Sequence, residues 1–372
     1  MVTNLPPDAV AQFKRAAASK TKAEKLKNLK LFLSMIPDHK GTERLRANVK
    51  RQISRLEEGL ERDKAKRRQA RRKRALSLSK GKDEILLLLF YRNIELRCRF
   101  LSGLLGSNST SLLSDTVKPH SIRIGGVNTI CLPMNVSLIA SPDYQDFVRQ
   151  ADGAIFAISS EEELRDCAAA IASMRRFGVF FISPGSEVRV GKAPSRGVEI
   201  SGHSAFLSRD EAMAHLRDLG QSGIVAEVGR FSTAYSLDAS LANGALELAL
   251  WLVAPDEVRS DRDDAILLDG SVPAKIMRLS QIEEDPMYLL HEVLAATKSI
   301  RVWTKEPGEK EVPADPVLLK EGSTVLDLAR SIHGELAAGL RYAVVHRPTE
   351  RAGSIRVGAG FKLSDGDVVE IH

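Results

Sequence analysis

Residues 82–106, KDEILLLLFYRNIELRCRFLSGLLG, decide the fold class of this chain. The apolar run that begins at Ile85 predicts a buried β-strand, and the residues after it predict a helix. A strand that turns directly into a helix is where nucleotide-binding folds place a glycine-rich loop, whose backbone N–H groups surround the phosphates. This stretch contains no glycine before Gly103. The sequence therefore predicts an α/β domain without the usual phosphate loop.

Composition sets outer limits on the class of protein. The chain has 372 residues, of which 43% are hydrophobic and 27% are charged, enough for two or more globular domains. Cys98, Cys131 and Cys167 are far apart and lack metal-ligand spacing, which argues against a disulfide framework and against a zinc site. No apolar run approaches the about 20 residues that span a bilayer. We expect a cytoplasmic protein with no bound metal or cofactor.

The charge of the chain is divided unevenly. The first 82 residues hold 24 Lys and Arg against 8 Asp and Glu, a net charge of +16, whereas the remaining residues hold 30 against 40, a net charge of −10. Such a division is typical of a basic arm for a polyanion attached to an acidic body.

Two amphipathic helices are predicted on either side of PDHKG (37–41). Apolar residues recur there at spacings of three and four: Leu26, Leu29, Leu33 and Ile36 before it, and Leu45, Val49, Ile53, Leu56 and Leu60 after it.

KAKRRQARRKR (64–74) continues the second helix with eight basic residues in eleven and no acidic one. This segment has no apolar face to bury, so it is either a solvated helix end or bound to phosphates. An anionic membrane is a weaker alternative, because no apolar face accompanies the charge. RNA or DNA is the predicted ligand, with ribosomal RNA preferred. The residues predicted to contact it are Lys40, Arg44, Arg46, Lys64, Lys66, Arg67, Arg68, Arg71, Arg72, Lys73 and Arg74.

The C-terminal stretch has the most regular pattern of the chain. SIRVWTK (299–305), RYAVVH (341–346) and the end of LSDGDVVEIH (363–372) predict strands, and GSTVLDLARSIHGEL (322–336) predicts a capped amphipathic helix. In this order the segments resemble a TGS domain, a β-grasp module of RNA- and ribosome-associated proteins. The resemblance implies that this part of the chain contacts the ribosome.

Two longer stretches extend the resemblance along the chain. IPDHKGTERLRANVKRQISRLEEGL (36–60) and SVPAKIMRLSQIEEDPMYLLHEVLAATKSIRVWTK (271–305) resemble the developmentally regulated GTP-binding protein family, relatives of the Obg GTPases. The resemblance implies an α/β fold in three parts. These are a basic helical hairpin and arm in 1–80, a P-loop-GTPase-like domain in 83–298 with a small α/β subdomain inserted at about 175–243, and a TGS domain in 299–372.

The same resemblance locates nucleotide-site positions that this sequence has replaced. Tyr91 and Leu96 stand where the phosphate loop has glycines, Arg97 stands at its lysine, and Cys98 stands at the magnesium-binding hydroxyl. Side chains at glycine positions fill the space that a phosphate needs, and a thiol is a poor ligand for magnesium. Thr116 is a weak match to the threonine of switch one. APDE, with Ala254, Pro255 and Glu257, stands where the base-reading N-K-x-D motif is expected.

These replacements predict a noncatalytic pseudo-GTPase that binds the ribosome and ribosomal RNA, and that acts in stalled or hibernating ribosomes. Ribosomal proteins or a small regulatory protein are further predicted partners. The alternative is a divergent GTP-binding protein or GTPase that holds its nucleotide through atypical contacts. A third hypothesis is a regulatory dimer with an active relative.

Overall fold

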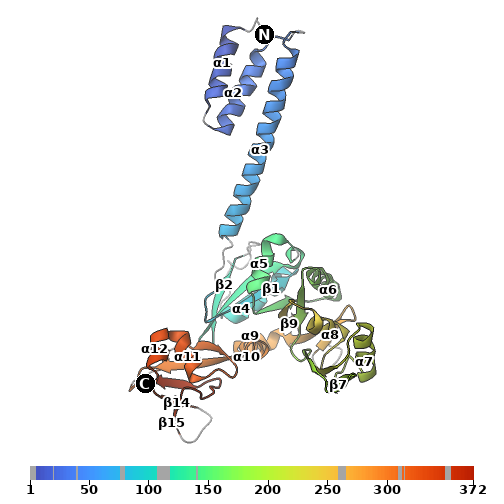
Figure 1. The fold of residues 1–372 in the computed structure, drawn as a ribbon, viewed down its shortest axis with the longest axis vertical. Coiled ribbons are helices and arrows are strands. Elements are labelled where there is room, and N and C mark those ends of the chain that lie inside the picture. The colour runs from blue at the N-terminus through green and yellow to red at the C-terminus, as the bar shows by residue number, and fades with distance from the viewer. Residues whose placement is uncertain are drawn as a thin grey trace. The chain divides into compact units, whose positions relative to one another are not determined.

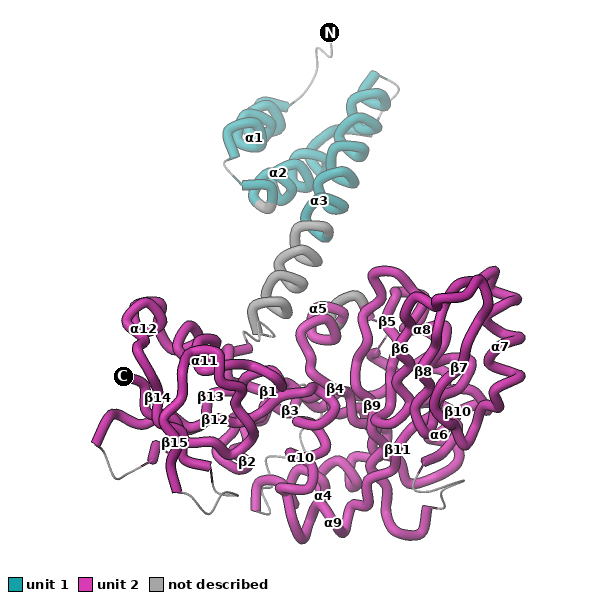
Figure 2. Tube along the Cα trace, turned by 60° about the horizontal axis from the view of Figure 1, so that its bottom comes forward, with its two compact units in different colours: residues 1–77 teal, residues 78–372 magenta. Residues whose placement is uncertain are grey.

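The computed structural model describes residues 6–19, 21–38, 41–75, 80–106, 118–139, 141–258, 265–308, 312–313, 315–347 and 353–372. For residues 23, 62–75 and 142–144 it describes the backbone alone. The chain divides into two compact units, residues 1–77 and 78–372 (Figure 2). Among the described helices, none is long and apolar enough to cross a membrane.

The N-terminal unit consists of helices α1 (Pro7–Ala18), α2 (Lys22–Met35) and α3 (Glu43–Ala75). α2 begins at Thr21, whose side-chain oxygen accepts a hydrogen bond from the Glu24 N–H at 3.2 Å. α2 and α3 correspond to the predicted hairpin, and the α3 backbone stays helical through the basic run 64–74. α1 was not predicted. It packs on α2 through the buried Ala9 and Ala16 and through Phe13, whose ring centre lies 5.1 Å from that of Phe32.

The second unit is built on an eight-stranded sheet with β1 in its interior (Figure 1). The strand order is β10-β11-β9-β4-β1-β3-β2, and β5 pairs with the first half of β9. β1, β3, β4, β9 and β11 run parallel, so their carboxyl ends meet at one edge of the sheet. The strands are β1 (Glu84–Tyr91), β2 (His120–Ile124), β3 (Val127–Asn135), β4 (Gly153–Ala157), β5 (Val179–Ile182), β9 (Leu246–Ala254), β10 (Ala265–Leu268) and β11 (Val272–Arg278).

Apolar side chains cover both faces of β1. On one face, Leu87, Leu89 and Tyr91 belong to a buried cluster with residues of α4 (Ile94–Leu105), α9 (Leu279–Glu284) and α10 (Pro286–Ala296). On the other face, Leu88 and Phe90 are fully buried as well. The helices that follow β3 and β4 are α5 (Pro142–Gln150) and α6 (Glu161–Arg175), and a short 3-10 helix η2 (Val136–Leu138) precedes α5. A strand that is apolar on both faces is typical of a parallel sheet covered by helices.

A small α/β subdomain is inserted between β5 and β9. Its three-stranded sheet has the order β6-β8-β7 and is covered by two helices. Gly229 is required where the subdomain meets the main sheet, because a Cβ there would lie 2.5 Å from the carbonyl oxygen of Gly185. The elements are β6 (Val188–Lys192), β7 (Val198–Gly202), α7 (Arg209–Asp218), β8 (Ile224–Val228) and α8 (Ala234–Leu241).

The C-terminal domain is a five-stranded sheet with the order β13-β12-β16-β14-β15. α11 covers one face of it, and its core contains Val302, Leu328, Val345 and Val369. Thr324 and Asp327 form a capping box at the start of α11. The elements are β12 (Ser299–Lys305), β13 (Val317–Lys320), α11 (Val325–Ile332), α12 (Gly334–Gly339), β14 (Ala343–His346), β15 (Ile355–Val357) and β16 (Val368–Ile371).

A very short connection joins the C-terminal domain to the last helix that packs on the main sheet. Only Thr297 and Lys298 separate α10 from β12, and Lys298 adopts a positive φ of 48° to make this turn. The Leu318 N–H also donates to Asp83 Oδ1 at 3.0 Å, just before β1 begins. β13 of the C-terminal domain is thus tied to the residue that precedes β1.

A single added methyl group tests the packing at the centre of the sheet. A Cβ at Gly153 would lie 2.4 Å from Cζ3 of the fully buried Trp251. We expect Gly153→Ala to lower the free energy of unfolding by about 1–3 kcal/mol, because the ring has no room to move away. Gly191→Ala, where no atom lies within 4 Å, is the matched control and should not destabilise the protein. Denaturant unfolding of both variants measures the difference, and equal stabilities would contradict this account of the core.

Candidate functional site

The turn from β1 into α4 consists of Arg92 and Asn93. Asn93 is the N-cap of α4, since its side-chain oxygen accepts hydrogen bonds from the N–H groups of Glu95 at 2.9 Å and Leu96 at 3.3 Å. These amides are the groups that a helix N-terminus offers to a phosphate. The carboxylate of Glu95 lies in the same first turn. An anion at this helix end would have to displace Asn93 and approach a carboxylate.

Three of the predicted loop residues contact one another next to this turn. The Arg97 side chain is only 1% exposed, and its Nη1 donates to the Tyr91 hydroxyl at 2.8 Å. The Arg97 Cζ lies 4.6 Å from the centre of the Tyr91 ring, and Nη2 donates to Cys98 Sγ at 3.8 Å. Leu96 belongs to the apolar cluster between α4 and the sheet. The positive charge predicted at the lysine position is therefore buried against β1.

The predicted base-reading positions lie at the same edge of the sheet, in the turn after β9. Ala254 is the buried last residue of β9, and Pro255 and Glu257 follow it. Arg278, at the end of β11, holds this turn: its Nη1 donates to the carbonyl oxygens of Val258 at 2.5 Å and Pro255 at 3.4 Å. Ser280 adds a hydrogen bond of 2.9 Å to Asp256 Oδ1.

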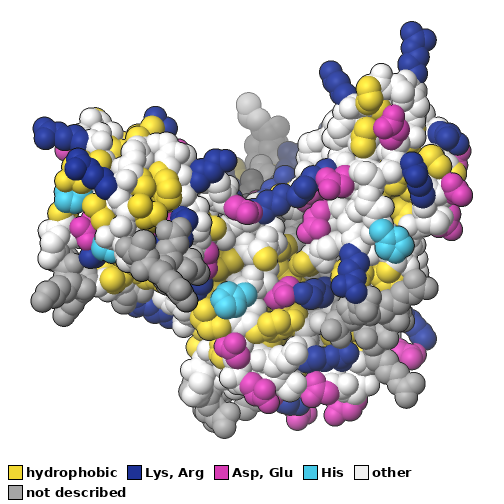
Figure 3. Space-filling model, turned by 90° about the horizontal axis from the view of Figure 1, so that it is seen from below, with side chains coloured by type: hydrophobic (Ala, Val, Ile, Leu, Met, Phe, Trp, Pro, Cys, Tyr) yellow, Lys and Arg dark blue, Asp and Glu magenta, His cyan; other side chains and the backbone are white. Residues whose placement is uncertain are grey.

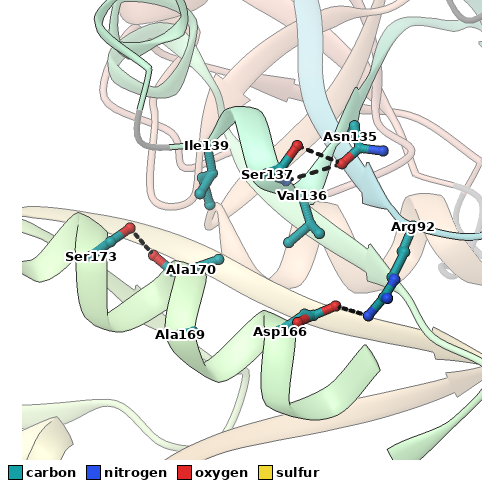
Figure 4. Close-up of a pocket in the computed structure, with 9 residues that line it drawn as sticks. All are labelled: Arg92, Asn135, Val136, Ser137, Ile139, Asp166, Ala169, Ala170 and Ser173. Carbon is teal, nitrogen blue, oxygen red and sulfur yellow. Dashed lines mark hydrogen bonds and ion pairs between the residues drawn. The ribbon is translucent and has the colours of Figure 1, made fainter. Parts of the chain in front are cut away.

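A hollow of about 480 Å³ opens beyond the carboxyl ends of β1 and β3 (Figure 4). Arg92 enters it just after the end of β1, Asn135 from the end of β3, Ser137 from η2, and Asp166 and Ser173 from α6. Asn135 Oδ1 accepts from the Ser137 N–H at 3.1 Å and from the Ser137 hydroxyl at 2.9 Å. The remaining lining residues are Val136, Ile139, Ala169 and Ala170. The hollow therefore combines an apolar wall with a few polar groups that point into it.

The charge in this hollow is held by ion pairs. The Arg92 guanidinium donates from Nη1 to Asp166 Oδ2 at 2.5 Å and lies 3.0 Å from Glu162 Oε1. The hydrogen bond and charge of Asp166, followed by those of Glu162, raise the pKa of Arg92. Since half of the Arg92 side chain is exposed, these pairs orient the guanidinium without stabilising the fold much.

Sequence analysis missed Arg92, Asp166 and Arg278. The signal for Arg92 was present, because a charged residue that directly follows a buried parallel strand lies at the carboxyl edge of the sheet. Asp166 and Arg278 carried no such signal, because they meet this edge through tertiary contacts with Arg92 and with the turn after β9. Among the described residues, no three His, Cys, Asp or Glu side chains lie together as a metal site would require.

The other predicted site residues are placed as follows. Thr116 and Lys40 lie outside the described residues. Arg44 is exposed at the start of α3, whereas Arg46 Nη1 donates to the Ile36 carbonyl oxygen at 2.7 Å and its Nε pairs with Asp38. Arg46 thus holds the connection between α2 and α3. The side chains predicted to contact RNA from residue 64 onward lie in the segment of which only the helical backbone is described.

Comparison with known families identifies one domain directly. The family model of the TGS domain matches residues 300–372. The C-terminal domain is a TGS domain. This match confirms what the pattern of strands and helix in the last part of the sequence predicts.

Over part of its length, the chain is homologous to GTP-binding proteins. It is 35% identical over 86 residues to an uncharacterized GTP-binding protein of Caenorhabditis elegans, covering 23% of this chain and 24% of the relative. It is 32% identical over 84 residues to a developmentally-regulated GTP-binding protein 2 homolog of Dictyostelium discoideum, covering 23% of each chain. The chain therefore matches about a quarter of the length of these curated relatives.

Among solved structures, the Schizosaccharomyces pombe YchF GTPase is similar to this chain with a TM-score of 0.39 and 10% identity. The similarity covers 79% of this chain and 99% of that one.

The relatives overturn one prediction from the sequence. The replaced loop residues predict a noncatalytic pseudo-GTPase, yet the matching relatives are named GTP-binding proteins. The prediction of a noncatalytic pseudo-GTPase that is no enzyme is therefore wrong. It rested on the replacement of the phosphate-loop, magnesium-binding and base-reading positions of the family. The structure brings further polar groups to the same edge of the sheet, among them Arg92 and Asn135.

The burial of His120 should make the stability of the protein depend on pH. Burial, followed by the charges of Arg97 and Lys118, lowers the pKa of His120 below its usual value of about 6.5. Below that pH the unfolded chain binds a proton that folded His120 does not, so stability should fall as the pH drops. We expect His120→Gln to flatten this fall. Urea unfolding at pH values from 5 to 8 measures it, and parallel curves for the two proteins would count against the assignment.

Proposed function

We propose that this chain is a divergent GTP-binding protein that holds its nucleotide by contacts other than a glycine-rich phosphate loop. The observation that carries the proposal is the hollow at the carboxyl ends of β1 and β3, with Arg92 pointing into it (Figure 4). The names of the homologous relatives suggest which nucleotide to test first.

The position of the hollow supports ligand binding on general grounds. From β1 the chain passes through α4 and β2 to β3 on one side, and then to β4 on the other side of β1. Open α/β sheets bind ligands at this kind of reversal, in the crevice outside the carboxyl ends of the strands. A volume of about 480 Å³ lies within the range of small-molecule sites.

The chemistry of the hollow suits a phosphate group at one point. Arg92 offers a planar guanidinium, which binds phosphate through two parallel N–H donors. Glu162 and Asp166 hold that guanidinium in place. On binding, Arg92 would exchange these two ion pairs for hydrogen bonds to the phosphate. The Asn135 amide and the Ser137 hydroxyl lie beside it as further polar groups. The N-terminal amides of α4 do not take part in this arrangement, because Asn93 already accepts their hydrogen bonds.

Nucleotide binding tests the proposal directly. We expect the full chain to bind GTP and GDP in the micromolar range with magnesium present. Arg92→Ala should weaken this binding about tenfold or more, because a charge-assisted hydrogen bond to phosphate is lost. Isothermal titration of both proteins with GTP, GDP and ATP gives the affinities.

Arg99→Ala is the matched control for that experiment. Arg99 is exposed to a similar degree, 52% against 48% for Arg92, and it pairs with Glu283 on the far side of α4. Its loss should leave nucleotide affinity unchanged. A wild-type chain that binds none of the three nucleotides would refute the proposal, and an equal loss in the two variants would move the site away from the hollow.

We also propose that the basic end of α3 binds RNA, with ribosomal RNA as the first candidate. The helical backbone through residues 64–74 supports this, because a continuous helix presents its basic residues in a regular array along a phosphate backbone. The unit that carries it has its own apolar core, which includes Leu29, Phe32 and Val49. The basic run is therefore not needed to fold the unit.

Salt dependence tests the RNA proposal. The arm-neutralised chain carries Gln in place of Lys66, Arg67, Arg71 and Arg72, and Gln is a good helix former. If these residues meet phosphates, the log-log salt slope of RNA affinity should fall by roughly three units, because each lost contact no longer releases counterions. Ribosome or RNA binding measured from low to physiological salt gives both slopes. Coinciding slopes would show that the run is only a solvated helix end.

A further inference from the structure

One carboxylate connects two helices of the inserted subdomain to α6. Asp238 of α8 accepts a hydrogen bond from Arg175 Nη2 at 2.6 Å, and its other oxygen lies 2.8 Å from His215 Nε2 of α7. Arg175 is the last residue of α6. Its Cζ also lies 5.6 Å from the ring centre of Phe180 and 5.8 Å from that of Tyr235. The C-terminal end of α6 is therefore held by α8 and by β5.

The surface of the inserted subdomain gives less indication of a role. In the right part of Figure 3, where this subdomain lies, Lys and Arg side chains are mixed with Asp and Glu. Arg189 and Glu227, for example, pair on adjacent strands of its sheet at 3.5 Å. A surface with both signs of charge interspersed is typical of a solvated face.

The other end of α6 is held by Arg92. Glu162 and Asp166 lie in the first half of the helix and pair with the Arg92 guanidinium at the hollow (Figure 4). Asp166 and Arg175 are about 14 Å apart along the helix axis, at a rise of about 1.5 Å per residue. A single uninterrupted helix thus has one ion pair at the hollow and one at the inserted subdomain.

A phosphate on Arg92 would change the force on this helix. Arg92 attracts Glu162 and Asp166, whereas a phosphate in contact with Arg92 would repel both carboxylates. The bound and free states would then differ in how they hold α6, which is the condition for a ligand to shift a conformational equilibrium. Small sliding of packed helices is a common form of such a shift.

We propose that α6 couples the hollow to the inserted subdomain. An anionic group on Arg92 displaces the first half of α6, and the movement loosens the Arg175–Asp238 pair. The identity of the anion rests on the proposed nucleotide site, whereas the coupling rests on the contacts of α6. Coupling between two sites is reciprocal, so that loosening the pair should in turn favour the ligand.

The inserted subdomain has a second attachment that does not involve α6. The Ser232 hydroxyl donates to the Ser186 carbonyl oxygen at 3.2 Å and accepts from the Gly229 N–H at 2.8 Å. These residues lie in the two loops that connect the subdomain to the main sheet. Loosening of the Arg175–Asp238 pair should therefore affect α8 locally and leave the subdomain attached.

The first experiment needs no nucleotide. Arg92→Glu places a carboxylate beside Glu162 and Asp166, so it repels α6 as a phosphate would. We expect the amides of α8 in the full chain to exchange with deuterium about two- to fivefold faster than in the wild type, the range for loss of one partly exposed ion pair. Asp238→Asn should give the same acceleration, and combining the two changes should add nothing.

Arg189→Ala is the matched control, because it breaks an exposed ion pair of the same subdomain that α6 does not share. It should leave exchange in α8 unchanged. Exchange in the TGS strands β12 and β16 should match the wild type in every variant, which checks that each one is folded. Mass spectrometry of the exchanged peptides gives all these rates.

The second experiment adds GTP with magnesium. Saturating GTP should accelerate exchange in α8 of the wild type, and Asp238→Asn should bind GTP about two- to fivefold more tightly, by the same coupling factor. A wild-type chain that binds no nucleotide would refute the nucleotide site alone, since the result for Arg92→Glu would still decide whether α6 couples the two regions.

Three results would overturn the coupling. Exchange in α8 could be the same in Arg92→Glu as in the wild type, or the effects of Arg92→Glu and Asp238→Asn could simply multiply. GTP could also bind with equal affinity to the wild type and Asp238→Asn while leaving α8 unchanged. A magnesium ion between the phosphate and the two carboxylates would produce that last result, because it would hold α6 in place.

Discussion

The fold depends on the burial of β1. Its residues from Ile85 to Tyr91 are all apolar and all buried, so they need cover on both faces and a partner strand on each side. β3 and β4 supply the parallel partners, and the helices that connect parallel strands supply the cover. The carboxyl ends of five strands then meet at one edge. Arg92 and Asn135 of the candidate nucleotide site come together through this convergence.

The same constraint explains why the turn after β1 is closed. Tyr91 ends the strand with a ring that must stay buried, and the Arg97 guanidinium lies over this ring and donates to its hydroxyl. Asn93 occupies the first amides of α4. A polar ligand at this edge must therefore lie beside the turn, where β3 and α6 contribute its walls, rather than inside it. The homology to GTP-binding proteins and the altered loop become compatible in this arrangement.

Sequence patterns predicted the structure correctly where the residues of a single element form a recognisable pattern by themselves. The apolar run of β1, the alternation in the last strands and the charge of 64–74 are of this kind, and the TGS domain could be named from them. Patterns failed where function depends on residues that meet only in the folded chain. Nothing local distinguishes Arg97, which is buried, from Arg99, which is exposed on the same helix. Helix α1 was missed for a related reason, because two of its buried residues are the small Ala9 and Ala16 and a third is the polar Gln12, which donates to Asn28.

The short connection between α10 and β12 has a mechanical consequence. A domain joined by a long flexible linker can reorient freely, but Thr297 and Lys298 leave no slack between the helix and the strand. The orientation of the TGS sheet is therefore set by α10. α10 in turn follows α9, which begins directly after Arg278 at the end of β11. A force applied to the C-terminal domain would be transmitted as torque to the turn that Arg278 holds after β9, at the edge of the sheet where a ligand would lie.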